Sequence, residues 1–143
     1  MQYWLLKSEP FKYSWEQLLQ DGSTFWDGVR NFQARNNLKA MKQGDLACFY
    51  HSNEGKEIVG IVKIIKEAYP DHTTDEPDWV MVDVAPVCSL KKPVSLATIK
   101  AHHILQNMAL VRQSRLSVVP LTQEEFDLIC EIGEVDVNLL KNI

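Results

Sequence analysis

The stretch Leu46-Ala-Cys-Phe-Tyr-His-Ser-Asn-Glu-Gly-Lys-Glu-Ile-Val-Gly-Ile-Val-Lys-Ile-Ile-Lys-Glu-Ala68 contains two apolar runs separated by a turn. The first run, residues 46–51, is short, and the second, residues 58–68, is rich in isoleucine and valine. Asn53-Glu54-Gly55 between them is typical of a hairpin turn. Because a hairpin joins neighbouring antiparallel strands, this stretch predicts an antiparallel or mixed sheet rather than a doubly wound parallel one.

Three further strands are predicted on either side of this hairpin. Residues 2–6 form an apolar and aromatic run that indicates a buried strand. Residues 79–87 alternate between large apolar and smaller or polar side chains, as a half-buried strand does. Residues 115–121 indicate another strand, and Pro120 favours its edge or its end. Residues 70–78, with four acids and two prolines, are predicted to form a loop.

Helices are predicted at both ends of the chain and between the strands. Ser14 followed by Gln17 is typical of a helix-capping box, and Gly22 of a helix end. Thr122 and Glu125 form a second box. The four predicted helices cover residues 15–21, 33–41, 94–105 and 123–132. The order of elements predicts one α+β domain over residues 1–143, with a small curved mixed sheet or barrel flanked by helices.

Composition and charge narrow the class of protein. The 143 residues are 45% hydrophobic and 24% charged, which indicates a globular domain rather than a disordered chain or a coiled coil. The net charge of −4 argues against a protein that coats nucleic acid through bulk charge. However, residues 28–44 and 84–123 contain no acid, and the excess of acids lies in residues 70–83 and near the C-terminus. The chain can therefore still present a basic face.

The sequence contains no pattern for a cofactor, a metal or covalent catalysis. Cys48, Cys88 and Cys130 are far apart and form no Cys-x-x-Cys pair, which predicts free thiols in a reducing compartment. His102 and His103 are adjacent and point to different helix faces, so we expect no shared metal. No signal peptide or apolar run of transmembrane length is recognised, and a cytoplasmic protein is expected.

Polar segments at the predicted strand and helix ends are the candidate functional residues. They combine aromatic faces for stacking, hydroxyl and amide groups for a base edge, and arginines for phosphate, which are the groups needed to hold an unstacked nucleotide. The segments are Lys7-Ser8-Glu9-Pro10, Phe25-Trp26-Asp27-Gly28-Val29-Arg30-Asn31, Tyr50-His51-Ser52 and Arg112-Gln113-Ser114-Arg115.

The tryptophans carry two alternative interpretations. Trp26 lies in a turn-like context, and it either covers the sheet as a core residue or serves as a stacking platform. Trp4 and Trp15 occupy patterned strand and helix positions, which predicts that both belong to the core.

Five segments in order along the chain closely resemble the EVE domain family. The resemblance extends from Tyr3 to about Ile132, and it implies a PUA-like fold, a mixed β pseudo-barrel with flanking helices. The segments are WLLKSEP, WDGVRNFQARNNL, GDLACFYHS, IVGIVKI and MALVRQSRLSV.

The family is similar to YTH domains, which bind N6-methyladenine in RNA through an aromatic cage. By this resemblance Ser8 and Trp26 are implied to contact a base. Glu9 stands where YTH domains usually carry Asn, which implies that a different base edge is read, since a carboxylate accepts hydrogen bonds from exocyclic amines. EVE proteins are linked to modified cytosine in DNA, so a modified base is the implied ligand.

We therefore hypothesise a non-catalytic module that binds DNA or RNA carrying a modified base, most simply a 5-substituted cytosine. Its phosphate contacts are predicted to be Arg30, Arg35, Arg112 and Arg115. Its base pocket is predicted to comprise Lys7, Ser8, Glu9, Trp26, Asn31, Tyr50, His51, Ser52 and Ser114.

Two alternatives from other classes remain at this point. One is a small enzyme acting on a modified nucleoside or base, similar to ASCH-domain hydrolases, with Lys7 and Glu9 as its acid–base pair. The other is an interaction module whose pocket no longer binds a ligand.

Overall fold

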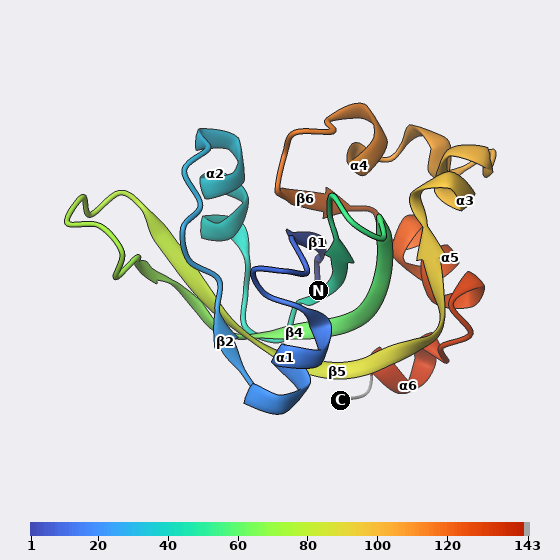
Figure 1. Ribbon diagram of the computed structural model, residues 1–143, viewed down its shortest axis with the longest axis horizontal. Coiled ribbons are helices and arrows are strands. Elements are labelled where there is room, and N and C mark those ends of the chain that lie inside the picture. Colours follow the sequence, from blue (N-terminus) through green and yellow to red (C-terminus); the bar gives the residue numbers. More distant parts are fainter. Residues whose placement is uncertain (142–143) are drawn as a thin grey trace.

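The computed structural model describes residues 1–141, which form a six-stranded mixed sheet surrounded by helices (Figure 1). The strand order across the sheet is β2-β5-β4-β3-β1-β6. The strands are β1 (Tyr3–Ser8), β2 (Thr24–Phe25), β3 (Leu46–His51), β4 (Glu57–Pro70), β5 (Val80–Ser95) and β6 (Val118–Leu121). The helices are α1 (Trp15–Asp21), α2 (Phe32–Ala40), α3 (Leu96–Ala101), the 3-10 helix η1 (Leu105–Asn107), α4 (Ala109–Arg112), α5 (Gln123–Ile132) and α6 (Val137–Lys141).

The sheet contains both kinds of strand pairing. β3, β4 and β5 form the antiparallel meander that the central stretch predicts. β1 lies between β3 and β6, and Leu5 faces Cys48 in a parallel pair and Val119 in an antiparallel pair. The β1–β3 pair is parallel because α1, β2 and α2 lie between the two strands and return the chain to the starting edge.

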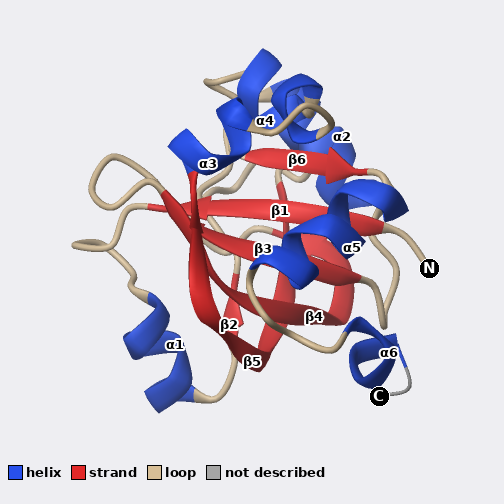
Figure 2. Cartoon of the chain, turned by 90° about the vertical axis from the view of Figure 1, so that its right-hand side faces the viewer, coloured by secondary structure: helices blue, strands red, loops and turns tan. Residues whose placement is uncertain are grey.

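The two longest strands bend the sheet into a pseudo-barrel. β4 and β5 pair along most of their length, and their register shifts at several points, one of them between Ile58 and Gly60. Such irregularities bend a strand and increase its twist. Figure 1 shows β4 and β5 sweeping around β1, and Figure 2 shows the strands at the centre with helices around them. The predicted fold class is confirmed.

Local sequence signals position the helix ends. The Ser14 side chain accepts a hydrogen bond from Gln17 N at 3.0 Å, and Gly22 closes α1 with a φ of 79°. Thr122 and Glu125 form the predicted capping box at the start of α5. No helix within residues 1–141 is long and apolar enough to span a membrane.

The region after β4 differs from the prediction in its details. The expected helix over residues 94–105 is wrong, because β5 continues to Ser95 and only residues 96–101 form α3. The chain then turns at His102, whose Nδ1 accepts hydrogen bonds from the backbone N–H groups of Ile104 and Leu105. These two bonds give the backbone an alternative to continuing the helix. The two-residue strand β2 and the helices α4 and α6 were not predicted.

The core fills the inside of the curved sheet. Trp4 and Trp15 are both buried, as predicted. The Trp15 ring lies directly over Gly60, where an added Cβ would stand 2.2 Å from the ring, so only glycine fits at that position. The Trp15 indole N–H donates to Ser89 Oγ at 2.8 Å, which fixes α1 against β5.

Candidate functional site

A cleft of about 680 Å³ opens between the end of β1, the loop that leads to α1, and β2. β2 reaches this place because it pairs with β5, with Phe25 opposite Asp83. Ten of the eleven lining residues lie between Lys7 and Asp27, and β5 adds Asp83 from a distant part of the sequence. Its lining residues are Lys7, Ser8, Lys12, Tyr13, Asp21, Ser23, Thr24, Phe25, Trp26, Asp27 and Asp83.

Trp26 belongs to both the core and the cleft wall. Its backbone N–H donates to Val82 O at 2.7 Å, which extends the β2–β5 pairing by one bond. The residue is 9% exposed, and its ring meets the Phe49 ring edge-on, with 5.6 Å between centroids. Trp26 is therefore a core residue that also lines the cleft, and its role as a stacking platform stays a prediction.

Lys7 and Ser8 bring the end of β1 into the cleft. Ser8 Oγ donates to the Tyr13 carbonyl at 2.5 Å, which holds the loop after β1 against the strand. Lys7 Nζ donates to the Ser114 carbonyl at 2.9 Å. Burial lowers the pKa of Lys7, and within residues 1–141 no carboxylate lies at ion-pair distance from its ammonium group. Lys7 is therefore a cation with a neutral partner on the wall of the cleft.

Three carboxylates line the same cleft, and each has a partner. Tyr13 Oη donates to Asp21 at 2.8 Å. Tyr69 Oη donates to Asp83 at 2.5 Å, and burial together with this carboxylate raises the pKa of Tyr69 to about 12. The Asp27 carboxylate lies 3.5 Å from His72 Nε2. The cleft thus combines hydrogen-bond acceptors with the Lys7 donor.

Sequence reasoning did not single out most of these lining residues. Asp83 belongs to an acid-rich stretch that the charge argument placed outside the site. Tyr13 and Thr24 reach the cleft only because Ser8 and β5 hold their segments there. Phe25 and Asp27 lie in the candidate segment around Trp26, but sequence reasoning assigned them no role in the base pocket.

Glu9 and Asn31, predicted for the base pocket, do not line the cleft. Asn53 Nδ2 donates to Glu9 Oε1 at 2.6 Å, and Lys12 Nζ lies 3.1 Å from Glu9 Oε2. Asn31 is the N-cap of α2, and its side chain accepts from Ala34 N at 2.9 Å. Glu9 and Lys7, the acid–base pair of the enzyme alternative, are therefore not brought into one cleft.

Tyr50, His51 and Ser52 lie behind the cleft wall, at the end of β3. Tyr50 is buried, and burial raises the pKa of its hydroxyl. His51 Nε2 accepts a hydrogen bond from the backbone N–H of Trp15 at 3.1 Å, and burial lowers the pKa of the imidazole. Ser52 N donates to Ser8 O at 2.9 Å. These groups hold the segment that carries Ser8 and the start of α1.

The segment with Arg112, Ser114 and Arg115 contacts one residue of the cleft, Lys7. All three are exposed, and the Ser114 carbonyl is the acceptor for Lys7 Nζ. Within the described part of the chain neither Arg112 nor Arg115 forms an ion pair. The end of α4 and the turn after it therefore carry two exposed arginines, and the backbone of this turn contacts the Lys7 side chain.

Arg30 and Arg35 lie in a different environment from this turn. The Arg35 guanidinium lies 4.8 Å from the ring centroids of both Phe32 and Trp79, which are themselves stacked at 5.4 Å. Arg30 lies 5.6 Å from the Trp79 ring. The charge pattern suggested that the acid-rich residues 70–83 lie apart from the acid-free residues 28–44. In the structure the two stretches pack against each other.

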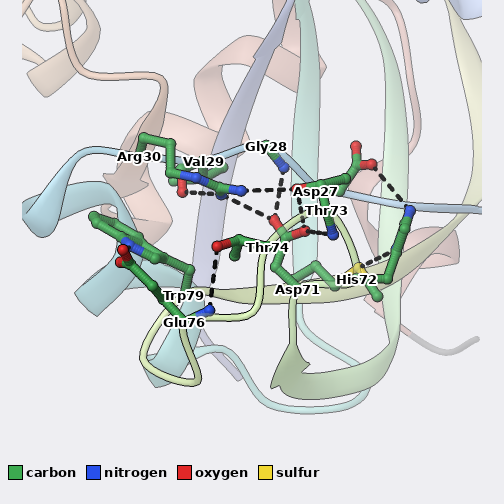
Figure 3. A network of polar contacts seen from close by, with 11 residues as sticks. Asp27, Gly28, Val29, Arg30, Asp71, His72, Thr73, Thr74, Glu76 and Trp79 are labelled. Atoms are coloured by element: carbon green, nitrogen blue, oxygen red, sulfur yellow. Dashed lines mark hydrogen bonds and ion pairs between the residues drawn. The ribbon is translucent and has the colours of Figure 1, made fainter.

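One carboxylate holds this packing together (Figure 3). Asp71 Oδ2 accepts hydrogen bonds from Gly28 N at 2.8 Å and Arg30 Nη1 at 3.1 Å. Asp71 Oδ1 accepts from the backbone N–H and the hydroxyl of Thr73 at 2.7 and 2.5 Å. Burial would raise the pKa of Asp71, but the bonds from Thr73, Gly28 and Arg30 outweigh it and lower the pKa to about 2.

The residues 1–141 contain no group of three or more His, Cys, Asp or Glu side chains placed to hold a metal ion.

Comparison with known proteins assigns the family. The model of the EVE domain matches residues 2–132. Thymocyte nuclear protein 1 of Gallus gallus is 46% identical, over 92% of this chain and 69% of that protein.

Solved structures agree with this assignment. A protein from Agrobacterium tumefaciens is 48% identical, with a TM-score of 0.93 and 94% of each chain covered. The human THYN1 protein, solved in complex with DNA containing 5-methylcytosine, is 43% identical, with a TM-score of 0.89 over 95% of this chain and 99% of that chain. The YTH domain of Zygosaccharomyces rouxii MRB1, 15% identical with a TM-score of 0.60 over 92% of this chain and 86% of that chain, shares the fold.

Proposed function

Because this chain belongs to the EVE domain family, we propose that it is a non-catalytic reader of DNA that carries a 5-substituted cytosine, held in the cleft beside Trp26. The observation that carries this proposal is the cleft itself, which combines an aromatic wall with a lysine and carboxylates. The 43% identical human THYN1 protein, solved with DNA containing 5-methylcytosine, supports the choice of ligand.

The size and walls of the cleft suit a single extruded base. Its volume of about 680 Å³ lies within the range of ~300–1,000 Å³ that small-molecule sites occupy. Phe49 holds Trp26 from behind, so the indole is a rigid surface for stacking. A base stacked on an aromatic side chain gains about 1–3 kcal/mol. A flipped cytosine would thereby recover part of the energy lost when it leaves the duplex.

Polar groups in the cleft match the hydrogen-bonding edge of cytosine. Cytosine presents a donor at its exocyclic amine and acceptors at N3 and O2. Asp27 and Asp83 are acceptors for the amine, and Lys7 Nζ is a donor for O2 or N3. Thymine and uracil carry a carbonyl in place of the amine, so they would face the carboxylates with an acceptor. This assignment moves the amine-reading role from Glu9 to Asp27 and Asp83.

The charge distribution supports contact with only a few DNA phosphates. Arg112 and Arg115 would hold phosphates that flank the flipped nucleotide. The sequence predicts Arg30 and Arg35 as further phosphate contacts, but Asp71 engages Arg30 and the Trp79 ring engages Arg35, so we assign no phosphate contact to Arg30. Because few cationic side chains are proposed to contact phosphates, binding should release few counterions from the DNA, which gives a shallow salt dependence.

The test is a titration of fluorescent DNA duplexes with one 5-methylcytosine, one cytosine or one thymine at the same position. We expect the 5-methylcytosine duplex to bind most tightly and the thymine duplex most weakly. Trp26→Phe should reduce the preference for the modified base, whereas the matched Trp79→Phe, outside the cleft, should keep it. The same titration is made with an RNA of the same sequence that carries one 5-methylcytosine. Equal binding of all three DNA duplexes, or tighter binding of this RNA, would overturn the proposal.

A further inference from the structure

The segment from Trp26 to Arg30 carries two cleft residues but no regular secondary structure. Only its first residue continues the pairing with β5, through Trp26 N and Val82 O. Gly28 has a φ of 75°, a conformation that glycine adopts without strain and that lets the chain turn away from the sheet. The conformation of this segment must therefore be fixed by contacts with another part of the protein.

Those contacts come from Asp71, His72 and Thr73, which follow β4 in the connection to β5 and are called the hairpin tip below (Figure 3). Four hydrogen bonds converge on the Asp71 carboxylate, and two of them come from the segment, from Gly28 N and Arg30 Nη1. The Asp71 side chain has no exposed surface. Arg30 is held at a second point, because its Nη2 donates to Thr73 Oγ1 at 2.7 Å. An ionised carboxylate that collects these donors makes stronger bonds than a neutral acceptor would.

The next residue of the hairpin tip holds the other end of the segment. His72 lies 3.5 Å from the Asp27 carboxylate through Nε2. Its ring meets the Phe25 ring edge-on, with 4.6 Å between centroids. Phe25 and Asp27 both line the cleft. The hairpin tip thus touches the cleft segment on both sides of Trp26.

We propose that Asp71 is a positioning residue for the cleft, which holds Gly28 and Arg30 so that Trp26 and Asp27 form its wall. Asp71 itself does not line the cleft. It acts through the backbone of Gly28, one residue after Asp27. The proposal rests on the proposed function only for its binding readout, since the conformation of the segment is measured without a ligand.

The test compares Asp71→Asn with Asp45→Asn. Asp45 is the matched control, because it is also buried and also collects hydrogen bonds, from Gln2 N, Trp4 Nε1 and Lys42 N, but it does not line the cleft. Both substitutions keep the side-chain shape and replace an acceptor oxygen with an amide nitrogen. Measurements are made at a temperature at which both variants are fully folded.

Two readouts separate positioning from general stabilisation. The first is the hydrogen-exchange rate of the Gly28 amide by NMR, and the second is affinity for the 5-methylcytosine duplex. We expect Asp71→Asn to accelerate Gly28 exchange at least tenfold and to weaken binding about tenfold. Asp45→Asn should lower the melting temperature and leave both readouts unchanged. Equal changes in the two variants, or wild-type readouts in Asp71→Asn, would overturn the proposal.

A milder variant covers the case in which Asp71→Asn does not fold. Thr73→Val keeps the shape of the side chain but removes the hydroxyl that bonds both Asp71 and Arg30. As in Asp71→Asn, Gly28 exchange should become faster and binding weaker, each by about threefold. Unchanged Gly28 exchange would count against the proposal. If the wild-type protein binds no duplex, the proposed function fails, and the Gly28 exchange rates alone decide the role of Asp71.

Discussion

Two buried carboxylates, Asp45 and Asp71, collect hydrogen bonds in different regions of this molecule. Asp45 accepts from Gln2 N, Trp4 Nε1 and Lys42 N, and so joins the start of β1 to the turn between α2 and β3. Asp71 joins the hairpin tip to an irregular loop beside the cleft. The same chemistry therefore serves regular structure in one region and the shape of a candidate site in the other. What differs is the segment that supplies the donors.

The largest expected effect is on stability, and it should be greater at Asp45 than at Asp71. Asp45→Ala leaves the buried Trp4 indole N–H and two backbone N–H groups without their acceptor, and should lower the free energy of unfolding by about 3 kcal/mol. Asp71→Ala should cost about 2 kcal/mol, because the partly exposed Arg30 can turn toward water. Urea unfolding measures both values, and a larger loss at Asp71 would contradict the comparison.

The next effect concerns binding alone. Trp26→Ala removes the stacking surface and should weaken binding of the 5-methylcytosine duplex by about 2 kcal/mol, or roughly 30-fold. Asp45→Asn should leave binding unchanged at a temperature at which it is folded. Fluorescence titration measures both variants. Comparable losses of affinity in the two would mean that the Asp45 region also shapes the cleft.

Acid should weaken the Asp71 region in a defined pH window. The pKa of Asp71 is lowered from 3.8 to about 2, so the folded state favours the charged carboxylate. Its contribution to stability, up to about 2 kcal/mol, is fully present above pH 4 and is lost as the pH falls toward 2. The wild-type protein should therefore lose more unfolding free energy between pH 5 and pH 2 than Asp71→Asn does. If the difference in unfolding free energy between the wild type and Asp71→Asn did not change with pH, the lowered pKa of Asp71 would be contradicted.

The smallest effect distinguishes the exposed arginines from those at the hairpin tip. Arg112→Gln with Arg115→Gln should weaken modified and unmodified duplexes alike, by about fivefold, and reduce the salt slope by about 1 for each arginine that contacts a phosphate. Arg30→Gln should weaken binding without changing the slope, since Arg30 is engaged by Asp71. A reduced slope in Arg30→Gln would show that Arg30 contacts phosphate after all.

The sequence predicts this fold well where local signals are strong. The Asn53-Glu54-Gly55 turn, the caps at Ser14 and Thr122, and the two strands of the central hairpin each depend on neighbouring residues, and the structure confirms them. The strand expected over residues 115–121 is shorter, because it begins only at Val118. β2 was missed because its two residues form a strand only by pairing with β5. The helix expected over residues 94–105 failed for a related reason, since β5 extends through Ser95 by pairing with β4.

The site was less predictable, because it is assembled from contacts between distant segments. Lys7, Ser8 and Trp26 were found through their residue types and family resemblance, and all three line the cleft. Asp83 reaches the cleft through strand pairing, and Asp71 reaches Gly28 through a long hairpin. Neither relation leaves a spacing that a single sequence reveals. The distribution of acids along the sequence also misled, because the acid-rich residues 70–83 pack against Arg30 in space.

The position of β1 has a consequence for the order in which the protein is assembled during synthesis. Tyr3 pairs with Leu46 on one side and with Leu121 on the other, so β1 gains its second neighbour only when β6, more than 100 residues later in the chain, has been synthesised. A nascent chain that has not yet emerged as far as β6 leaves one side of an apolar strand unpaired, which is a template for aggregation. Lys7 N also bonds to Ser117 O at 3.0 Å, so the wall that carries Lys7 and Ser8 is completed in the same late step. A binding-competent protein is therefore expected only after β6 has left the ribosome.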